Sequence, residues 1–278
     1  MKGFILINAF SGIGEHQASR LREEFAKLGF DVPIVRNEVG AIPSNADFCV
    51  FLDKDLYTAK SLENRGVRLF NSSEAIALCD DKMLTYLALE GVVNQPLTIP
   101  SSFAYSDAPI SDNELNYLEE MLGYPMVLKI NKQSRGEGVF LVKDREELNA
   151  YVTRFRTIPH LYQKFISFSS GRDTRVIVVG SRVICAMERV NEHDFRSNVE
   201  QGGVGKAVTI SQEMQKMAIE VSQKLGLEYC GIDFLVDENG GIYVIEVNSN
   251  AFFKGIEGAT GVSVAGAYAR HILSVLQG

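Results

Sequence analysis

Residues 231–248 read GIDFLVDENGGIYVIEVN and contain the pattern that decides the fold. GIDFLV and IYVIEVN are rich in β-branched and aromatic residues, and the turn residues between them predict a β-hairpin. Because side chains alternate between the two faces of a strand, we expect one face of this hairpin to be polar and the other to belong to the core. The expected core face carries Ile232, Phe234, Val236, Tyr243, Ile245 and Val247.

The polar face of this hairpin carries two carboxylates and an amide. A four-residue loop pairs Asp237 with Ile242. That register places Asp233 opposite Glu246, and Asn248 lies two residues further along the same face. Directly opposed carboxylates repel each other unless a cation lies between them, and Asp, Glu and Asn oxygens are ligands that Mg²⁺ accepts. The pattern predicts a metal site; the alternative is an exposed hairpin whose carboxylates face water.

The composition restricts the class of protein. A chain of 278 residues with 46% hydrophobic and 23% charged residues is typical of a globular protein with one large domain or two to three small ones. The net charge of −7 argues against a nucleic-acid surface, and no apolar run approaches the length of a membrane span. The N-terminal run shows no signal-peptide cleavage pattern. We expect a cytoplasmic protein whose four scattered cysteines are free thiols.

The first part of the chain has the pattern of a small parallel α/β unit. Residues 4–10 predict a buried strand, residues 15–28 predict a helix with an apolar stripe, and VPIV and DFCVFLD predict further strands. The pair Gly12 and Gly14 matches half of a dinucleotide-binding fingerprint. Because the third glycine is missing, a tight turn before a helix is the preferred interpretation.

The rest of the chain predicts an α+β region in two lobes. Helices are expected at residues 71–91 (two), 112–122, 211–225 and 262–276, and strands at MVLKI, VFLV, LYQKFI, TRVIVVG and RVICAMERV. We assign residues 1–79 to an N-terminal α/β domain, 80–162 to a central lobe, and 163–278 to a C-terminal lobe that carries the metal site.

Residues 127–142, VLKINKQSRGEGVFLV, predict a phosphate-binding loop between two strands. Glycines let backbone N–H groups approach phosphate oxygens, and Lys129 places a charge inside the first strand, where it is costly without a partner. The loop itself contains Ser134, Gly136 and Gly138. It joins strand to strand, so it is not a Walker loop. An ordinary glycine hairpin is the alternative.

Arginines gather around the turns of the C-terminal part. They are Arg172, Arg175, Arg189 and Arg196, with Asp173 and Asp194 among them. In an acidic protein, arginines close to predicted phosphate and metal sites indicate anionic substrates. The alternative is a set of surface ion pairs that contribute little each. Residues 202–205 are expected to form a loop.

From about residue 71 to 270, the chain resembles the ATP-grasp carboxylate–amine ligases and is most similar to the RimK-type glutamate ligases. The resemblance rests on the order and spacing of NSSEAI, Asp81-Lys82, VLK, SRGEGV, residues 163–166, Asp173-x-Arg175, DFRSN, Gly202-Gly203, GIDFLV, IEVNSN and GIEGATG. It implies an ATP-grasp fold, α/β and α+β, in which ATP lies between the central and C-terminal lobes.

The resemblance also implies roles for individual residues. ATP contacts are implied for Lys82, Lys129, Ser134, Gly136, Gly138, Gln163, Lys164, Phe165, Asp173, Arg196, Ser197 and Asn198. Catalytic contacts to phosphate or substrate are implied for Arg175, Arg189, Arg196 and Asn198. Asp233, Glu246 and Asn248 are implied to bind two Mg²⁺ or Mn²⁺ ions. The chain departs from the family at Lys164, where an acidic residue is common, and at residues 250–253, near the substrate side.

The implied reaction is ATP-dependent amide formation through an acyl phosphate, with ADP and phosphate as products. The implied substrates are a small-molecule carboxylate and an amino acid or peptide, with neither nucleic acid nor membrane as partner; a homo-oligomer stays open. Two other classes remain: a catalytically silent or regulatory nucleotide-binding module of the same fold, and a dinucleotide-dependent oxidoreductase. The residues do not identify the acid or the amine.

Overall fold

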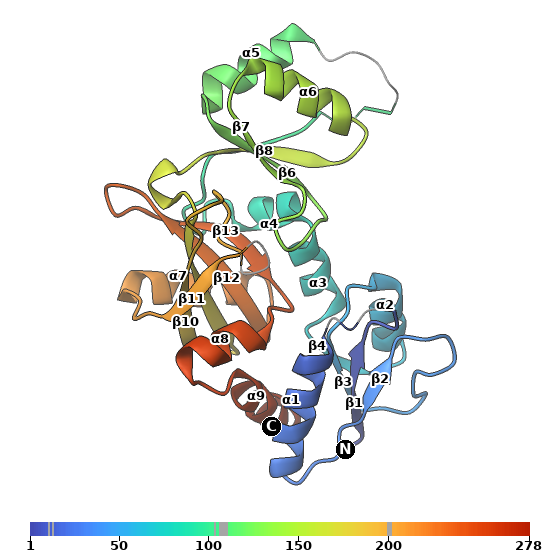
Figure 1. Cartoon of the computed structure of the whole chain (residues 1–278). Coiled ribbons are helices and arrows are strands. Elements are labelled where there is room, and N and C mark those ends of the chain that lie inside the picture. The colour runs from blue at the N-terminus through green and yellow to red at the C-terminus, as the bar shows by residue number, and fades with distance from the viewer. Residues whose placement is uncertain (11, 13, 103, 106–110, 199–201) are drawn as a thin grey trace.

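The structure, a computed structural model, describes residues 1–10, 12, 14–102, 104–105, 111–198 and 202–278. Figure 1 shows three lobes, each with its own β-sheet: an N-terminal lobe, a central lobe at the top, and a C-terminal lobe between them. No helix in the described residues is long and apolar enough to cross a membrane. The four cysteines are free, as predicted.

The N-terminal lobe is the predicted parallel α/β unit. Its sheet has the order β2-β1-β3-β4, and every pair is parallel. The strands are β1 (Gly3–Ile7), β2 (Ile34–Arg36), β3 (Phe48–Phe51) and β4 (Arg68–Phe70), and the helices are α1 (Glu15–Lys27) and α2 (Leu56–Asn64). The predicted apolar stripe of α1 is fully buried at Ala18, Leu21 and Phe25. The sequence pattern did not predict α2.

The central lobe is an antiparallel sheet with two helices. Its strands are β5 (Thr98–Pro100), β6 (Met126–Ile130), β7 (Val139–Val142) and β8 (His160–Lys164), in the order β5-β8-β6-β7, and its helices are α5 (Asp112–Leu122) and α6 (Arg145–Phe155). The helices α3 (Ser73–Asp80) and α4 (Lys82–Leu89) precede it. Side chains from residues 99–162 alone form the hydrophobic core of this lobe. We did not predict α6.

The C-terminal lobe is built on an antiparallel sheet with the order β11-β10-β9-β12-β13. Its elements are η1 (Ser167–Ser169), β9 (Arg172–Val179), β10 (Arg182–Val190), β11 (Val204–Ala207), α7 (Gln212–Lys224), β12 (Tyr229–Val236), β13 (Ile242–Asn248), α8 (Phe253–Thr260) and α9 (Val264–Gln277). Of the loop predicted at residues 202–205, Gly202 and Gly203 lie outside any strand, but the prediction was wrong for Val204 and Gly205, which belong to β11 and pair with β10. Ala75 of α3 and Leu89 of α4 join α7 in the core on one face of the sheet.

The hairpin of β12 and β13 has the predicted register at the site but not at its tip. Asp233 lies opposite Glu246, as expected, but Ile242 pairs with Val236 rather than with Asp237. A β-bulge between Asp233 and Phe234 absorbs the difference, because two residues of β13 then oppose one of β12. The tip of the hairpin is therefore shifted by one residue relative to the prediction.

The bulge also reverses which residues of β13 face the core between the hairpin tip and Glu246. Ile242 and Val244 belong to the buried core, although we expected Tyr243 and Ile245 there. Ile245 is only partly buried and lines a cleft. The assignment of Tyr243 and Ile245 to the core was wrong, because alternation along a strand reverses at a bulge.

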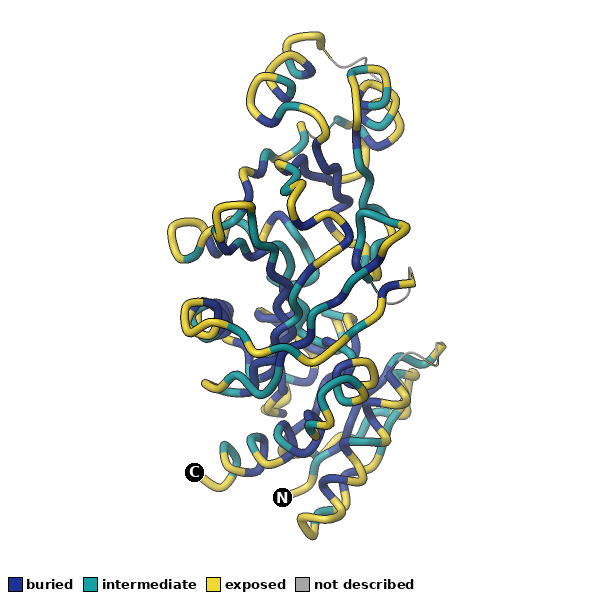
Figure 2. Tube along the Cα trace, turned by 60° about the vertical axis from the view of Figure 1, so that its left-hand side comes forward, coloured by how far each residue is buried: buried dark blue, intermediate teal, exposed yellow. Residues whose placement is uncertain are grey.

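The N-terminal and C-terminal lobes share one hydrophobic core. Phe25 and Phe48 belong to the same buried cluster as Tyr229, Phe253 and Tyr268. In Figure 2 the buried residues of the lower part of the molecule run through both lobes, with exposed residues on the outer faces of the helices. The two lobes therefore pack together as one unit.

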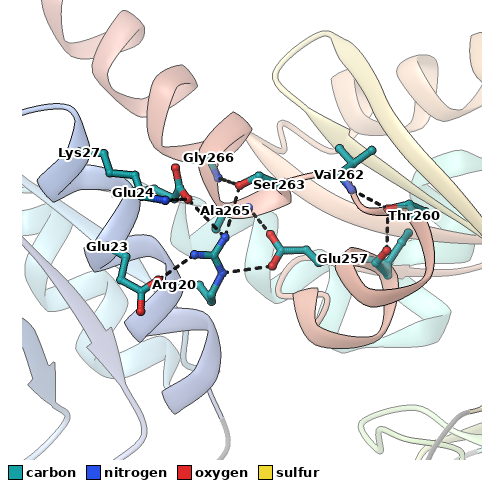
Figure 3. A network of polar contacts seen from close by, with 11 residues as sticks. Arg20, Glu23, Glu24, Lys27, Glu257, Thr260, Val262, Ser263, Ala265 and Gly266 are labelled. Carbon is teal, nitrogen blue, oxygen red and sulfur yellow. Dashed lines mark hydrogen bonds and ion pairs between the residues drawn. The ribbon is translucent and has the colours of Figure 1, made fainter.

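A polar network closes the edge of this shared core (Figure 3). Arg20 of α1 donates through Nε to Glu257 Oε2 at 3.3 Å and through Nη2 to Ser263 Oγ at 3.4 Å. Glu257 Oε1 accepts the backbone N–H of Ala265 at 3.0 Å, and Ser263 caps α9. Arg20 thus connects α1 to the ends of α8 and α9.

Candidate active site

A cleft of about 780 Å³ lies between the central and C-terminal lobes. Most of the residues predicted to contact nucleotide, substrate or metal line it together. They are Lys82, Lys129, Gly136, Gln163, Lys164, Phe165, Asp173, Arg189, Arg196, Ser197, Asn198, Asp233 and Glu246. These residues come from α4, β6, β8, β9, β10, β12, β13 and the connections between them, so the fold gathers residues that are distant in sequence.

The remaining predicted site residues lie around the cleft. Ser134, Arg175 and Asn248 line a second cavity of about 1180 Å³, which shares Asn198 and Glu246 with the cleft. Gly138 lines neither cavity; a Cβ atom there would lie 1.9 Å from Gln133 Oε1. A glycine is required at that position by its φ of 71° and by this close approach.

Two cations of the cleft hold the glycine loop by its backbone. Lys82 Nζ donates to the carbonyl of Gln133, and Arg196 Nη1 donates to the carbonyl of Gly136 at 2.9 Å. Gly136 has a φ of 76°, and a Cβ atom there would lie 3.1 Å from Asn198 Oδ1. The loop therefore lies directly against the residues that follow β10.

Lys129 and Glu246 are an ammonium and a carboxylate with no hydrogen bond or ion pair among the described residues. Lys129 is only 9% exposed. Burial lowers the pKa of Lys129 to about 8, against the opposing effect of the Glu246 charge. Burial also lowers the pKa of Lys82, which Glu246 again opposes. Charged groups without a protein partner, facing one cleft, suit a charged ligand.

Arg175 and Arg189 surround the predicted metal ligand Asp233. Arg175 donates through Nε and Nη2 to both carboxylate oxygens at 2.7 Å, and Arg189 Nη2 lies 2.9 Å from Oδ2. Strand pairing produces this cluster, because Arg175 is opposite Asp233 and Arg189 is opposite Asp173. Burial alone would raise the pKa of Asp233, but the two arginines hold it below its usual range. Asp173 has the opposite shift, because burial raises its pKa more than Arg189 lowers it.

These arginines remove the predicted need for a metal at Asp233. We expected a cation to relieve the repulsion between Asp233 and Glu246, but Arg175 and Arg189 already neutralise Asp233. No group of three or more His, Cys, Asp or Glu side chains that could hold a metal occurs among the described residues. The repulsion on which the sequence argument rested is therefore absent.

The donor set nevertheless fits a hard divalent cation. The Glu246 carboxylate and the Asn248 amide oxygen Oδ1 accept no hydrogen bond among the described residues, so these oxygens are available to a cation. A carboxylate offers about four lone-pair positions, and Asp233 uses three of them for arginine N–H groups. Asp233 can therefore add about one contact, while Glu246 and Asn248 are free to ligate.

The sequence analysis missed the apolar side chains and several polar ones that line the cleft. The missed residues are Val127, Gln133, Val139, Ile166, Ser169, Phe195, Leu235 and Ile245. Arg172, which the sequence analysis named among the clustered arginines, also lines the cleft. Phe195 packs edge-on against Phe165 with ring centroids 6.3 Å apart. Val127 could have been found, because it is two residues from Lys129 and so shares its face of β6. Ile245 could not, because it faces the cleft only through the bulge.

A family model described as "RimK-like ATP-grasp domain" matches residues 87–272. The chain belongs to the RimK-like ATP-grasp family. This match confirms the resemblance and the predicted fold class. The match begins within α4 and ends within α9, so the family domain includes both walls of the cleft.

Curated relatives of this RimK-like chain include human N-acetylaspartylglutamate synthase A, 32% identical over 95% of the chain and 65% of that protein. They also include human beta-citrylglutamate synthase B, 36% identical over 81% of the chain and 58% of that protein. The chain therefore spans roughly three-fifths of the length of these relatives.

Solved ATP-grasp structures share the fold of this RimK-like chain. D-alanine–D-alanine ligase from Bacillus anthracis, complexed with ATP, has a TM-score of 0.75 at 17% identity and covers 100% of this chain and 97% of its own. The ATP-grasp ligase PsnB, in a complex with Mg and ADP, has a TM-score of 0.70 at 16% identity and covers 98% and 96%. At these identities the comparison shows the ATP-grasp fold and no more.

Proposed function

We propose that the chain is an ATP-dependent carboxylate–amine ligase that forms an amide bond through an acyl phosphate and releases ADP and phosphate. The observation that carries this proposal is the cleft, in which Lys82, Lys129 and Arg196 meet the glycine loop and Glu246. Such an arrangement of cations and backbone N–H groups suits the terminal phosphates of a nucleotide. Family membership supports the ATP-grasp form of this chemistry.

The roles follow from the positions. Lys82, Lys129 and Arg196 bind the phosphates, and the glycine loop covers them. The apolar side chains of the cleft, with Phe165, receive the adenine ring. Glu246 and Asn248, with one further contact from Asp233, hold Mg²⁺ or Mn²⁺, and two such ions would neutralise charge on the transferred phosphoryl group.

The reaction consists of two displacements. An oxygen of the substrate carboxylate bonds to the γ-phosphorus while the bond from that phosphorus to the β-phosphate oxygen breaks, and ADP leaves. The nitrogen of the neutral amine then bonds to the acyl carbon, phosphate leaves with the oxygen it received, and the amine proton passes to solvent. The chain needs no covalent nucleophile, because positioning and cancellation of charge supply the rate enhancement.

The substrates we propose are a small carboxylic acid and an amino acid or peptide. Both curated relatives named above are synthases of glutamate conjugates. Because the second cavity meets the cleft at Asn198 and Glu246, it is the place for the substrates beside the γ-phosphate. We further propose the lobe boundaries 1–79, 80–162 and 163–278.

Three measurements test the ligase. Mg·ATP should raise the melting temperature, since a ligand at 100 times its dissociation constant stabilises by about 2.7 kcal/mol. With a working acid and amine, ion-exchange chromatography should find ADP in step with product, and hydroxylamine should trap a hydroxamate. AMP in place of ADP would overturn the mechanism, and no melting shift against Mg²⁺ alone would overturn nucleotide binding.

Glu246→Gln tests the proposed metal ligand separately. Turnover should be lost while the melting temperature without ligand stays the same or rises, because Glu246 has no protein partner among the described residues. Full activity in this variant would remove Glu246 from the metal site. A large loss of apo stability would assign it a structural role.

A silent nucleotide-binding module is the second candidate. It is favoured by the present contacts, in which Lys82 and Arg196 bind the loop and two arginines bind Asp233. Its signature is a melting shift with Mg·ATP but no phosphate release with any acid and amine pair. An oxidoreductase is not supported, because the chain belongs to the RimK-like ATP-grasp family and the N-terminal lobe, outside the match, carries only half of a dinucleotide-binding fingerprint.

A further inference from the structure

The carboxyl edge of the N-terminal parallel sheet opens into the second cavity. In the order β2-β1-β3-β4, the chain leaves β1 for one side of the sheet and returns on the other side at β3. In open α/β sheets, ligands bind at such a switch point, beyond the carboxyl ends of the strands. Asn8 follows β1 and Asp53 follows β3, and both line the cavity that Glu246 also lines.

Asp53 is a buried carboxylate without a cationic partner. It is 9% exposed and makes no ion pair with a lysine or arginine among the described residues. It accepts hydrogen bonds from Asn37 Nδ2 at 3.1 Å and from the backbone N–H of Lys54 at 2.7 Å, while both contacts from Asn8 Nδ2 are long, at 3.4 Å. Neutral donors offset only part of the cost of burying a charge.

The nearest lysine in sequence turns away from this carboxylate. The Lys54 ammonium instead binds Asp80 of α3 and donates to Ser134 Oγ of the glycine loop at 2.9 Å. Lys54, Arg135 and Arg175 line the same cavity as Asp53. The cavity also contains Asp80, which pairs with Lys54, and Glu246. Asp53 and Glu246 are thus its two carboxylates without a cationic partner among the described residues, beside three cationic side chains, a combination that complements a zwitterion.

We propose that Asp53 binds the ammonium group of an amino-acid or peptide substrate, so that the N-terminal lobe selects the amino compound for the proposed ligase. The bound ammonium loses a proton to solvent before its nitrogen attacks the acyl carbon. This inference rests on the proposed function. Asn8 and Asn37 are positioning residues that orient the carboxylate through their amide groups. The cationic side chains of the cavity receive the carboxylates of the same substrate.

Asp55 provides a matched control for Asp53. It lies two residues away at the same edge of the sheet and shares the Asn37 amide, which donates to Asp55 Oδ2 at 3.0 Å. It caps α2 through the N–H groups of Tyr57 and Thr58, and it does not line the cavity. Asp55→Asn removes the same charge and keeps a capping side chain.

The experiment uses the full chain with Mg·ATP, citrate or N-acetylaspartate as the acid, and each of the twenty amino acids. Phosphate release is the readout, and L-glutamate with its des-amino analogue glutarate is the first pair. In the wild type, the amino acid should bind at least tenfold more tightly than its des-amino analogue, measured as an inhibitor. Asp53→Asn should raise the KM for the amino acid at least tenfold and change the KM for ATP less than twofold. Asp55→Asn should leave both KM values within twofold of the wild type.

Three results would overturn the inference. One is an unchanged amino-acid KM in Asp53→Asn, and another is an equal loss in Asp53→Asn and Asp55→Asn, which would assign the cluster a structural role. The third is equal affinity for amino acid and des-amino analogue in the wild type, which decides the question even if Asp53→Asn does not fold. If Mg·ATP raises the melting temperature but no amino acid supports phosphate release, Asp53 has no such role while nucleotide binding stands.

Discussion

The N-terminal and central lobes both border the C-terminal lobe, but they are attached to it differently. The N-terminal lobe contributes Phe25 and Phe48 to a hydrophobic core that continues into the C-terminal lobe. The core of the central lobe is closed within residues 99–162. Near the cleft, Arg196 of the C-terminal lobe holds the glycine loop of the central lobe by a hydrogen bond to the Gly136 carbonyl.

The difference indicates where ligands can act. A shared apolar core can be disrupted only by exposing its side chains to water, so two lobes that share such a core should unfold together. A boundary of charged hydrogen bonds can exchange protein partners for ligand partners with little change in buried apolar area. The proposed nucleotide cleft lies at the polar boundary, and the four predictions below test this contrast.

The largest expected effect comes from matched deletions in the two cores. Ile272 of α9 and Leu148 of α6 are both fully buried, so Ile272→Ala and Leu148→Ala should each cost about 2–5 kcal/mol. Ile272→Ala should increase hydrogen exchange in β1 and β12 alike, because both strands contribute to the shared core. Leu148→Ala should act only within the central lobe. Exchange confined to the C-terminal lobe after Ile272→Ala would contradict the shared core.

The next effect concerns the polar boundary. Arg196→Met removes a cation that donates to the Gly136 carbonyl and lines the cleft. Since hydrogen bonds to charged groups contribute about 1.5–3 kcal/mol, the Kd for Mg·ATP should rise roughly 10- to 100-fold in calorimetric titration. Lys206→Met is the control, because Lys206 is 76% exposed and lies outside the cleft. Equal affinity in both variants would exclude Arg196 from phosphate binding.

As pH falls, the central lobe should lose stability before the N-terminal and C-terminal lobes do. His160 of the central lobe is buried and contacts the Tyr162 hydroxyl at 2.8 Å, and burial lowers its pKa. Below pH 6.5 the imidazole of His160 binds a proton in the unfolded chain but stays neutral in the folded lobe. The free energy of unfolding therefore falls by at most about 1.4 kcal/mol per pH unit until the pKa of the folded state is reached. Calorimetry from pH 7.5 to 5 should show this slope in the wild type and a flatter one in His160→Gln.

The lobes with the shared core should respond only at lower pH. Glu228 accepts hydrogen bonds from His271 and Arg68, and the bond from His271 lowers the pKa of Glu228 most. A lowered carboxyl pKa adds stability that is lost only as pH falls from the ordinary range of glutamate through the folded value. Loss of the shared-core transition before that of the central lobe would contradict this order.

The smallest effect should come from the network in Figure 3. Arg20→Met removes contacts from α1 to Glu257 and Ser263, but the Arg20 side chain is 23% exposed, so the loss should be about 1 kcal/mol or less and should shrink in high salt. Lys60→Met, at a side chain that is 66% exposed, should change the unfolding free energy by less. A loss of several kcal/mol in Arg20→Met would mean that the network, and not the apolar core, holds the lobes.

The sequence predicted elements and site residues where a local pattern was enough. The stripe of α1 and the strand with Lys129 follow from periodicity, and the resemblance supplied Lys82 and Arg196. The predicted pairing of Asp233 with Glu246 is confirmed, but the predicted turn was wrong by one residue and the bulge restores the pairing. The helices α2 and α6 were missed, although their caps, Asp55 and Asp144, were visible in the sequence.

What the sequence could not supply depends on contacts between strands. Nothing local shows that β9 lies beside β12, so the neutralisation of Asp233 by Arg175 could not be anticipated. For the same reason, the proximity of Asp53 to the cavity of Glu246 requires the packed lobes. The ligation and catalytic roles of these residues stay predictions.

Because of the bulge in β13, the length of the hairpin turn does not determine the position of Glu246 in the site. Ile245 is the extra residue that brings Glu246 opposite Asp233 although the tip pairs one residue out of step. Deleting Ile245 would reverse which face of the sheet the side chains of β13 occupy, either between the deletion and the tip or between the deletion and Asn248. Residues 237–241, by contrast, could be exchanged for another turn without moving Glu246. A protein engineer could therefore graft a new loop onto this tip, provided that Ile245 is retained.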